Sequence, residues 1–356
     1  MNMPSLILAI LVTGLSFSAA HAQDDNADQL PETKFAYVGS WSGLTLFRNF
    51  EQPFWSENIE EASDGRVTAQ VTTFDQMGMA SGDVFRQLQH GVFDIGSTVA
   101  DYVVSDAPAL AGLDMPTIAP DVATAEQVVD AFEPVLADIM QERFDAHLLA
   151  AVPYPPQVVF CNTEISGLSD LEGKKVRAAG GSETSFLEAI GAQSITMEFS
   201  EVPGGLQRGV IDCAVSGSLS GYSSGWYEVA DYLYSLPIGG WDYVITAMNG
   251  DAWNALDDDF QTWLQNEITE NYADEVWTAA VEQTTQGINC LTGQGECELG
   301  DPGDMTLVEP TEEDIERAHE VLVDQVLPEW ADGVDSKWVE RWNDTIGEQV
   351  GLQAEE

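Results

Sequence analysis

The chain has 356 residues and carries 61 acidic side chains against 12 basic ones, a formal net charge of −49. Proteins that bind nucleic acid or anionic lipid need clustered Lys and Arg, so this charge balance excludes both classes. Because 44% of the residues are hydrophobic, the chain can build a folded core, unlike acidic disordered segments. The length suggests two domains.

The first 22 residues predict a secretory signal peptide. They contain no charged side chain, and residues 6–12 form an apolar run that is too short to span a bilayer. Ala20 and Ala22 place small residues at the two positions that signal peptidase reads. The alternative is an ordinary buried helix. We expect cleavage after Ala22, with residues 23–32 as a flexible acidic leader of the exported protein.

Export would place the four cysteines in an oxidising compartment. Cys290 and Cys297 flank a turn-rich stretch, and this short spacing predicts a local disulfide. Cys161 and Cys213 each lie in a strand-like run, where they either form a second disulfide or serve as small buried hydrophobes. A catalytic thiol is disfavoured because only three histidines follow residue 22.

The hydrophobic pattern predicts two successive blocks of alternating strands and helices. The first block comprises strands 34–41, 66–74, 92–98 and 147–152, and helices 46–62, 83–89 and 123–146. The second block comprises strands 158–161, 175–178, 195–199, 210–214 and 243–248, and helices 185–190, 202–208 and 226–234. Long helices are predicted at 257–282, 312–327 and 335–346. This order predicts an α/β fold with two similar halves.

Sequence motifs of the common enzyme classes are missing. The chain has no phosphate-binding glycine loop with lysine, no His-Glu-x-x-His and no Cys-x-x-Cys. With 61 acidic residues, carboxylates fall close together by chance, so the sequence cannot single out a catalytic pair. Residues 257–259 are three consecutive aspartates, which we interpret as the first turn of a helix rather than a cation site. A secreted hydrolase with an acidic dyad is therefore the weakest alternative.

Arg177 is the most informative basic residue. It ends a predicted strand that leads through Gly180 and Gly181 into a helix. Open α/β folds bind ligands at this end of their strands, and a guanidinium there can hold a carboxylate through two hydrogen bonds. The alternative is a surface arginine, paired with the many acidic residues nearby.

Several stretches resemble the solute-binding proteins of TRAP (tripartite ATP-independent periplasmic) transporters, the DctP-like family. Residues 168–177 match the pattern L-x-D-L-x-G-x-K-x-R, and residues 200–212 are close to S-E-V-y-x-A-L-Q-x-G-v-v-D. Residues 88–96 are similar to the L-x-x-G-x-x-D-I element. Weaker similarity at 54–66, 74–78 and 253–256 extends the resemblance over nearly the whole mature chain.

The resemblance implies a two-lobe periplasmic-binding-protein-like fold, with a ligand cleft between the lobes and long connecting helices. Lobe I would comprise residues 33–154 and 243–283, and lobe II residues 155–242 and 284–311. Residues 312–356 would pack on both as C-terminal helices. The implied function is a monomeric periplasmic receptor, not an enzyme, that passes an organic acid to a membrane permease. The alternative is a binding protein of the same fold that serves a sensor or another uptake system.

The resemblance also assigns site residues. Arg177 would bind the ligand carboxylate, and Gln157 stands where the sialic-acid branch has a second arginine. The metal-dependent branch has a Glu-Trp pair where this chain continues with residues 214–216, so we expect no metal and no other cofactor. The remaining candidates for the cleft wall are Trp41, Ser42, Tyr102, Tyr154, Phe199, Ser216 and Trp241.

The charge predicts that folding depends on salt. A shell of net charge −49 repels itself, and the screening length falls from about 30 Å at 0.01 M salt to about 3 Å at 1 M. We expect the free energy of unfolding to rise with NaCl over this range, as suits a protein from a saline habitat. Urea denaturation at a series of NaCl concentrations measures this, and a flat series would contradict it.

Overall fold

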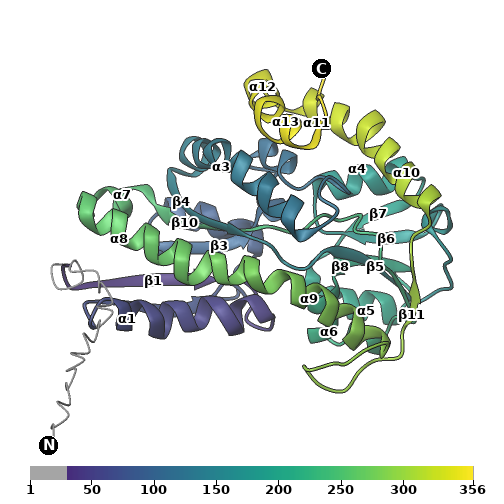
Figure 1. The fold of residues 1–356 in the computed structure, drawn as a ribbon, viewed down its shortest axis with the longest axis horizontal. Coiled ribbons are helices and arrows are strands. Elements are labelled where there is room, and N and C mark those ends of the chain that lie inside the picture. Colours follow the sequence, from purple (N-terminus) through teal and green to yellow (C-terminus); the bar gives the residue numbers. More distant parts are fainter. Residues whose placement is uncertain (1–29, 356) are drawn as a thin grey trace, which may run out of the picture.

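The computed structural model describes residues 30–355, which form two β-sheets with helices around them (Figure 1). The predicted signal peptide and residues 23–29 of the leader lie outside the described residues. None of the helices within residues 30–355 is long and apolar enough to cross a bilayer.

The first sheet has the strand order β2-β1-β3-β10-β4. Its strands are β1 (Thr33–Gly39), β2 (Val67–Thr73), β3 (Ile95–Val99), β4 (Ala146–Val152) and β10 (Val244–Asn249). Strands β1, β2 and β3 are parallel, whereas β10 runs antiparallel to β3 and β4. Every residue of β3 and β10 is buried, as expected for central strands covered on both faces.

Helices surround this sheet and are positioned by local capping. They include α1 (Ile59–Ala62), α2 (Val84–Gln89), α3 (Val122–Phe144), α7 (Gly250–Asn254) and α8 (Asp258–Ile268). Asp121 caps α3 by accepting a hydrogen bond from the Thr124 amide at 2.9 Å, and Asp145 ends the helix in the left-handed conformation. Asp257 caps α8 through the Phe260 amide, so the predicted helix start at residues 257–259 is confirmed.

The second sheet has the strand order β11-β9-β5-β8-β6-β7. Its strands are β5 (Gln157–Cys161), β6 (Lys175–Ala178), β7 (Gln193–Thr196), β8 (Cys213–Gly217), β9 (Tyr232–Tyr234) and β11 (Thr306–Val308). Strand β6 is parallel to both β7 and β8, while β5 is antiparallel to β8 and β9. The short helices α4 (Gly181–Ala189), α5 (Val202–Gln207) and α6 (Ser218–Ser223) belong to this lobe.

Long helices join the two lobes. Helix α9 (Asp274–Thr292) extends from the first lobe along the second, as Figure 1 shows, and contacts α6 there. The C-terminal helices are α10 (Glu312–Val321), α11 (Leu327–Gly333), α12 (Ser336–Trp342) and α13 (Glu348–Val350). Trp342 Nε1 donates to the Gly112 carbonyl at 2.8 Å, which fixes this end of the chain to the first lobe. The two sheets, with the helices that surround and join them, confirm the predicted two-lobe α/β fold.

Several secondary-structure predictions were wrong or incomplete, among them two short strands. The predicted helix 226–234 is a single 3₁₀ turn, Trp226–Glu228, followed by strand β9. Strand β11 was not predicted at all. Both strands have only three residues. Strand β9 pairs with β5 and β11, and β11 pairs with β9, so their conformation depends on long-range hydrogen bonds rather than on local periodicity.

The predicted disulfide between Cys290 and Cys297 is present, and Cys161 and Cys213, for which the sequence left two alternatives, also form a disulfide. Cys161 and Cys213 are directly opposite each other on the adjacent strands β5 and β8, and Cys290 and Cys297 close the loop after α9. The first pair connects residues 52 positions apart, and the second pair only seven. The Cys161–Cys213 bond closes the longer loop, so it restricts the unfolded chain more than the Cys290–Cys297 bond does.

This difference predicts unequal losses of stability. By the entropy of loop closure, replacing Cys161 and Cys213 together by Ser should lower the free energy of unfolding by roughly 4 kcal/mol. Replacing Cys290 and Cys297 should lower it by roughly 2 kcal/mol. Denaturation of the two double variants in the same buffer tests this, and a larger effect of the second pair would contradict the prediction.

Candidate ligand-binding site

Arg177 is a buried cation at the end of strand β6. Its side chain has only 2% of its surface exposed. Nε donates to the Met197 carbonyl at 2.9 Å, and Nη1 donates to the Val215 carbonyl at 2.7 Å. Among the described residues, Arg177 forms no ion pair within 4.0 Å. The guanidinium is thus held in one orientation by neutral carbonyls, with donors left for another group.

Three acidic side chains contribute to the electrostatic environment of Arg177 without pairing with it directly. Burial raises the pKa of Asp101 to about 7, with repulsion from Asp242 adding to the shift and attraction to Arg177 opposing it. Burial likewise raises the pKa of Asp242 to about 6 and that of Glu183 well above its usual range, and Arg177 opposes both shifts. The site therefore holds one cation among several carboxyl groups.

These carboxyl groups come from different parts of the fold. Asp101 follows β3 in the first lobe, Glu183 lies in the first turn of α4 in the second, and Asp242 lies in the segment that returns to the first. A Cβ atom at Gly180 would lie 2.5 Å from Oδ2 of Asp101, so the glycine allows the lobes to meet here. The lobes also meet where Ser182 Oγ donates to the Asp114 carbonyl at 3.1 Å.

Two carboxylate oxygens in this group have no partner. Asp101 Oδ1 and Glu183 Oε1 are buried and make no hydrogen bond, whereas Glu183 Oε2 accepts from the Ala179 amide at 2.8 Å. Asp114 differs, because its carboxylate accepts from the backbone amides of Trp241 and Asp242 at 2.8 and 2.6 Å. Asp114 therefore supports the chain segment, while Asp101 and Glu183 have unused acceptors.

Aromatic rings meet across the two lobes beside this group. Trp41 of the first lobe lies 5.7 Å from Phe199 of the second, measured between ring centroids. Phe199 stacks on Trp226 at 5.2 Å, and Trp41 makes an edge contact with Phe74 at 4.8 Å. The pKa of Tyr102 is raised by burial and by Asp242 and lowered by Arg177, so Tyr102 belongs to the same neighbourhood.

The other predicted site residues lie along the same seam, with side chains engaged locally. Gln157 is buried and donates through Nε2 to the Pro155 carbonyl at 2.8 Å. Ser216 is buried on β8, next to the Val215 carbonyl that binds Arg177. Tyr154 donates its hydroxyl to Ser40 Oγ at 3.3 Å.

Trp241 and Ser42 have evident structural roles. The Trp241 indole is 1% exposed, and its Nε1 donates to the Ala119 carbonyl at 2.9 Å, so the ring packs into the first lobe. Ser42 is bound to Asp75, whose carboxylate accepts from the Ser42 amide at 3.1 Å and from its hydroxyl at 2.5 Å. The Trp241 indole and the Ser42 hydroxyl are thus engaged in contacts of their own, whereas Arg177 acts on the pKa of Tyr102.

Sequence reasoning missed Asp101, Glu183 and Asp242. Each follows a feature that was recognised: the strand before residue 100, the Gly180-Gly181 turn, and Trp241. An acidic residue beside such a feature is not distinctive in a chain with 61 of them. Only their burial beside Arg177 distinguishes these three carboxyl groups from the solvated majority of the acidic side chains.

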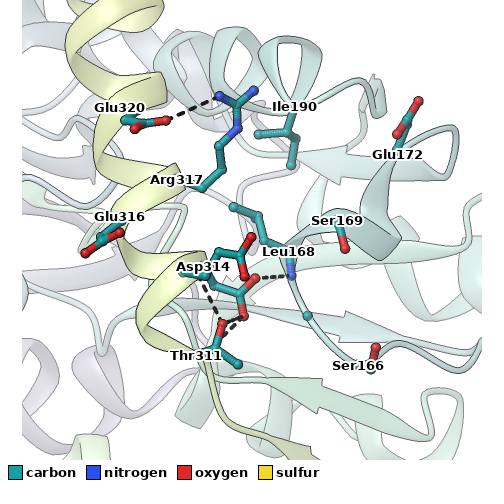
Figure 2. A pocket seen from close by; sticks show the side chains of 12 residues that line it. Ser166, Leu168, Ser169, Glu172, Ile190, Thr311, Asp314, Glu316, Arg317 and Glu320 are labelled. Carbon is teal, nitrogen blue, oxygen red and sulfur yellow. Dashed lines mark hydrogen bonds and ion pairs between the residues drawn. The ribbon is translucent and has the colours of Figure 1, made fainter.

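A cavity of about 590 Å³ lies between α10 and the turn Leu168–Leu171. Figure 2 shows Asp314 between Thr311 and Leu168, and Arg317 extending toward Glu320. Asp314 closes a capping box with Thr311 and accepts from the Leu168 amide at 3.0 Å. The acidic lining residues are Glu172, Glu313, Asp314, Glu316 and Glu320. With one arginine, ion-paired to Glu320, this cavity is a poor site for an anion.

Within residues 30–355, no group of three or more His, Cys, Asp or Glu side chains is arranged to hold a metal ion. The two lobes, joined by long helices and meeting around a buried arginine, define a two-lobe binding protein. The profile of the family "Bacterial extracellular solute-binding protein, family 7" (DctP) matches residues 49–329. The chain belongs to this family, whose members bind solutes and are not enzymes, as the sequence motifs predicted.

Similar proteins are known from several bacteria. The ectoine-binding periplasmic protein TeaA of Halomonas elongata is 27% identical over 225 residues, which are 60% of this chain and 63% of TeaA. The match thus spans less than two thirds of that relative. A TeaA structure has a TM-score of 0.78 at 22% identity, covering 90% of this chain and 99% of TeaA. DctP6 of Bordetella pertussis is a receptor that binds pyroglutamic acid. Its structure has a TM-score of 0.77 at 22% identity, covering 89% of this chain and 100% of DctP6.

The buried carboxyl groups predict how stability depends on pH. Asp101 and Glu51 both have pKa values raised by burial to about 7, so the folded state binds protons that the unfolded state releases above pH 5. The free energy of unfolding should therefore increase as pH falls from 8 to 6. The pKa of His147 is lowered by burial, which opposes this trend.

Urea denaturation of the unliganded protein at pH 8, 7 and 6 in constant salt measures this dependence. Asp101→Asn removes one of the buried carboxyl groups with a raised pKa and leaves Glu51 and Asp242 in place, so it should flatten the curve in part. Asp138→Asn, at an exposed position on α3, should not. Identical slopes for Asp101→Asn and wild type would contradict the assignment.

Proposed function

We propose that this protein is the periplasmic receptor of a TRAP transporter, and that it captures an organic acid by binding its carboxylate to Arg177 between the lobes. The observation that carries the proposal is a buried guanidinium, fixed by the carbonyls of Met197 and Val215 and lacking an ion pair among the described residues. Burying such a charge without a counterion is costly, and a ligand carboxylate would compensate it.

Ligand capture would require the lobes to move. Arg177 is almost fully buried, and the aromatic contact between Trp41 and Phe199 bridges the lobes beside it. A solute could reach the guanidinium only after the lobes separate, and it would be enclosed when they close. The division into lobe I (33–154 and 243–283), lobe II (155–242 and 284–311) and C-terminal helices (312–356) is part of this proposal.

The similar proteins support the type of ligand and the cellular location. TeaA binds ectoine and DctP6 binds pyroglutamic acid, which are small cyclic acids. The description of TeaA as periplasmic and as part of a TRAP transporter supports export after cleavage at Ala22 and delivery to a membrane permease. We propose a monomeric receptor that works without a metal or cofactor.

Replacing Arg177 tests the proposal. A ligand that binds only the folded protein raises its melting temperature, so a thermal-shift screen of carboxylates identifies binders of the wild type. Arg177→Ala should abolish the shift, whereas Arg208→Ala, at an exposed position in the same lobe, should preserve it. A retained shift in Arg177→Ala would sink the proposal.

Arg177 also holds backbone carbonyls, so Arg177→Ala could fail to fold. Arg177→Lys keeps the charge but loses the two-donor geometry that a guanidinium offers a carboxylate. Calorimetric titration of this variant should show affinity at least about tenfold weaker, equivalent to about 1.4 kcal/mol. Unchanged affinity would also argue against carboxylate binding at Arg177.

A further inference from the structure

The turn that leads from strand β6 into α4 docks directly on the first lobe. A Cβ atom at Gly180 would lie 2.5 Å from Oδ2 of Asp101 and 2.6 Å from both its Cβ and its Cγ. Asp101 follows β3 in the first lobe and is only 5% exposed. Its Cβ does not move when the side chain rotates, so a rotamer change of Asp101 cannot clear all of these contacts.

The backbone of the turn does not itself require glycine at this position. Gly180 has φ −154° and ψ −166°, an extended conformation that any residue adopts. It is the N-cap of α4, where Ser, Thr, Asp or Asn would be favoured because their side chains accept a hydrogen bond from the helix. The close approach of the first lobe is therefore the reason for glycine at residue 180.

A hydrogen bond between the lobes lies next to this contact. Ser182 is 4% exposed, and its Oγ donates to the Asp114 carbonyl of the first lobe at 3.1 Å. Arg177 lies shortly before Gly180 in the chain, at the end of the strand that leads into the turn. The same turn therefore follows the guanidinium and joins the two lobes beside it.

We infer that Gly180 is a positioning residue of the binding site: because it has no side chain, α4 can seat on Asp101 and the lobes can close beside Arg177. Ser182 then secures the closed arrangement through its hydrogen bond to Asp114. This inference rests on lobe closure, which is part of the proposed function, and it names the residue that limits closure. A single methyl group at residue 180 acts as a wedge between the lobes.

The wedge predicts that Gly180→Ala shifts the protein toward the open arrangement. The three atoms nearest to the added methyl group all belong to Asp101, so separation of the lobes relieves the clash. We expect the ratio of closed to open protein to fall at least about tenfold, because inserting a methyl group into a packed interface is unfavourable.

Gly181→Ala is the matched control in the same turn. Its Cβ would lie 3.8 Å from Cγ2 of Val104, which is an ordinary contact. Gly181 also lines a cavity of about 220 Å³ between α4, the first lobe and α11, so the added methyl group has room. The ratio of closed to open protein should therefore stay at the wild-type value.

Spin labels on Gln76→Cys and Glu201→Cys measure this ratio by pulsed double electron resonance on the intact protein without ligand. Both positions are exposed. Gln76 follows Phe74, which contacts Trp41, and Glu201 follows Phe199, which meets Trp41 across the lobes, so the distance between the labels changes when the seam opens. All four native cysteines form disulfides, so only the introduced thiols take the label.

A second substitution separates the wedge from general damage to the fold. Asp101→Gly removes the Cβ, Cγ and Oδ2 atoms that the methyl group would meet. The double variant Gly180→Ala with Asp101→Gly should therefore regain the short label-to-label distance that Gly180→Ala loses, which is the signature of a direct contact. If Gly180→Ala does not fold, Ser182→Ala decides, since it deletes only the hydrogen bond and should lower the ratio severalfold.

Three results would overturn the inference: a wild type without a population at short distance, the same ratio in wild type and in Gly180→Ala or, where that variant does not fold, in Ser182→Ala, or no recovery in the double variant. These outcomes are distinct from failure of the proposed function. If Arg177→Ala keeps the thermal shift while Gly180→Ala loses the short distance, carboxylate capture at Arg177 falls and the closure contact stands.

Discussion

The buried guanidinium of Arg177 sets the charge balance of the seam between the two lobes. Two backbone carbonyls, from Met197 and Val215, fix it at the end of strand β6 and satisfy part of its hydrogen-bonding capacity. Carbonyl groups do not neutralise its charge, so the surrounding protein has to supply negative groups or admit a ligand that does. The seam between the lobes contains acidic groups that act on it at longer range, and no acidic group within residues 30–355 forms an ion pair with it.

The acidic composition acts differently on the surface and in the seam. On the surface, carboxylates are solvated and salt screens their mutual repulsion. In the seam, Asp101, Glu183 and Asp242 are removed from water, and burial raises their pKa values. Their protonation is therefore coupled to whether the lobes are closed, since opening the seam would hydrate them.

The local sequence was sufficient to predict a helix, strand or turn where that element carries its own local signal. The strand at residues 175–178, the Gly180-Gly181 turn and the following helix were predicted because each carries a local signal. The helix that begins at Asp257 was predicted for the same reason, since Asp257 caps it directly. Strands β9 and β11 were not, because their three-residue segments depend on pairing with distant strands, β9 with β5 and β11, and β11 with β9.

The sequence alone determined the acidic composition, the α/β alternation and the family motifs, and it singled out Arg177 as a candidate. These follow from composition and from short-range patterns that do not depend on the rest of the fold. Only the tertiary structure showed which acidic residues differ from the rest. Asp101, Glu183 and Asp242 lie on three separate segments, and burial beside the same cation distinguishes them. It also gave the Trp241 indole a packing role in the first lobe. The physical reason is that a side chain's solvation and neighbouring charges are properties of the folded chain, and no local pattern encodes them.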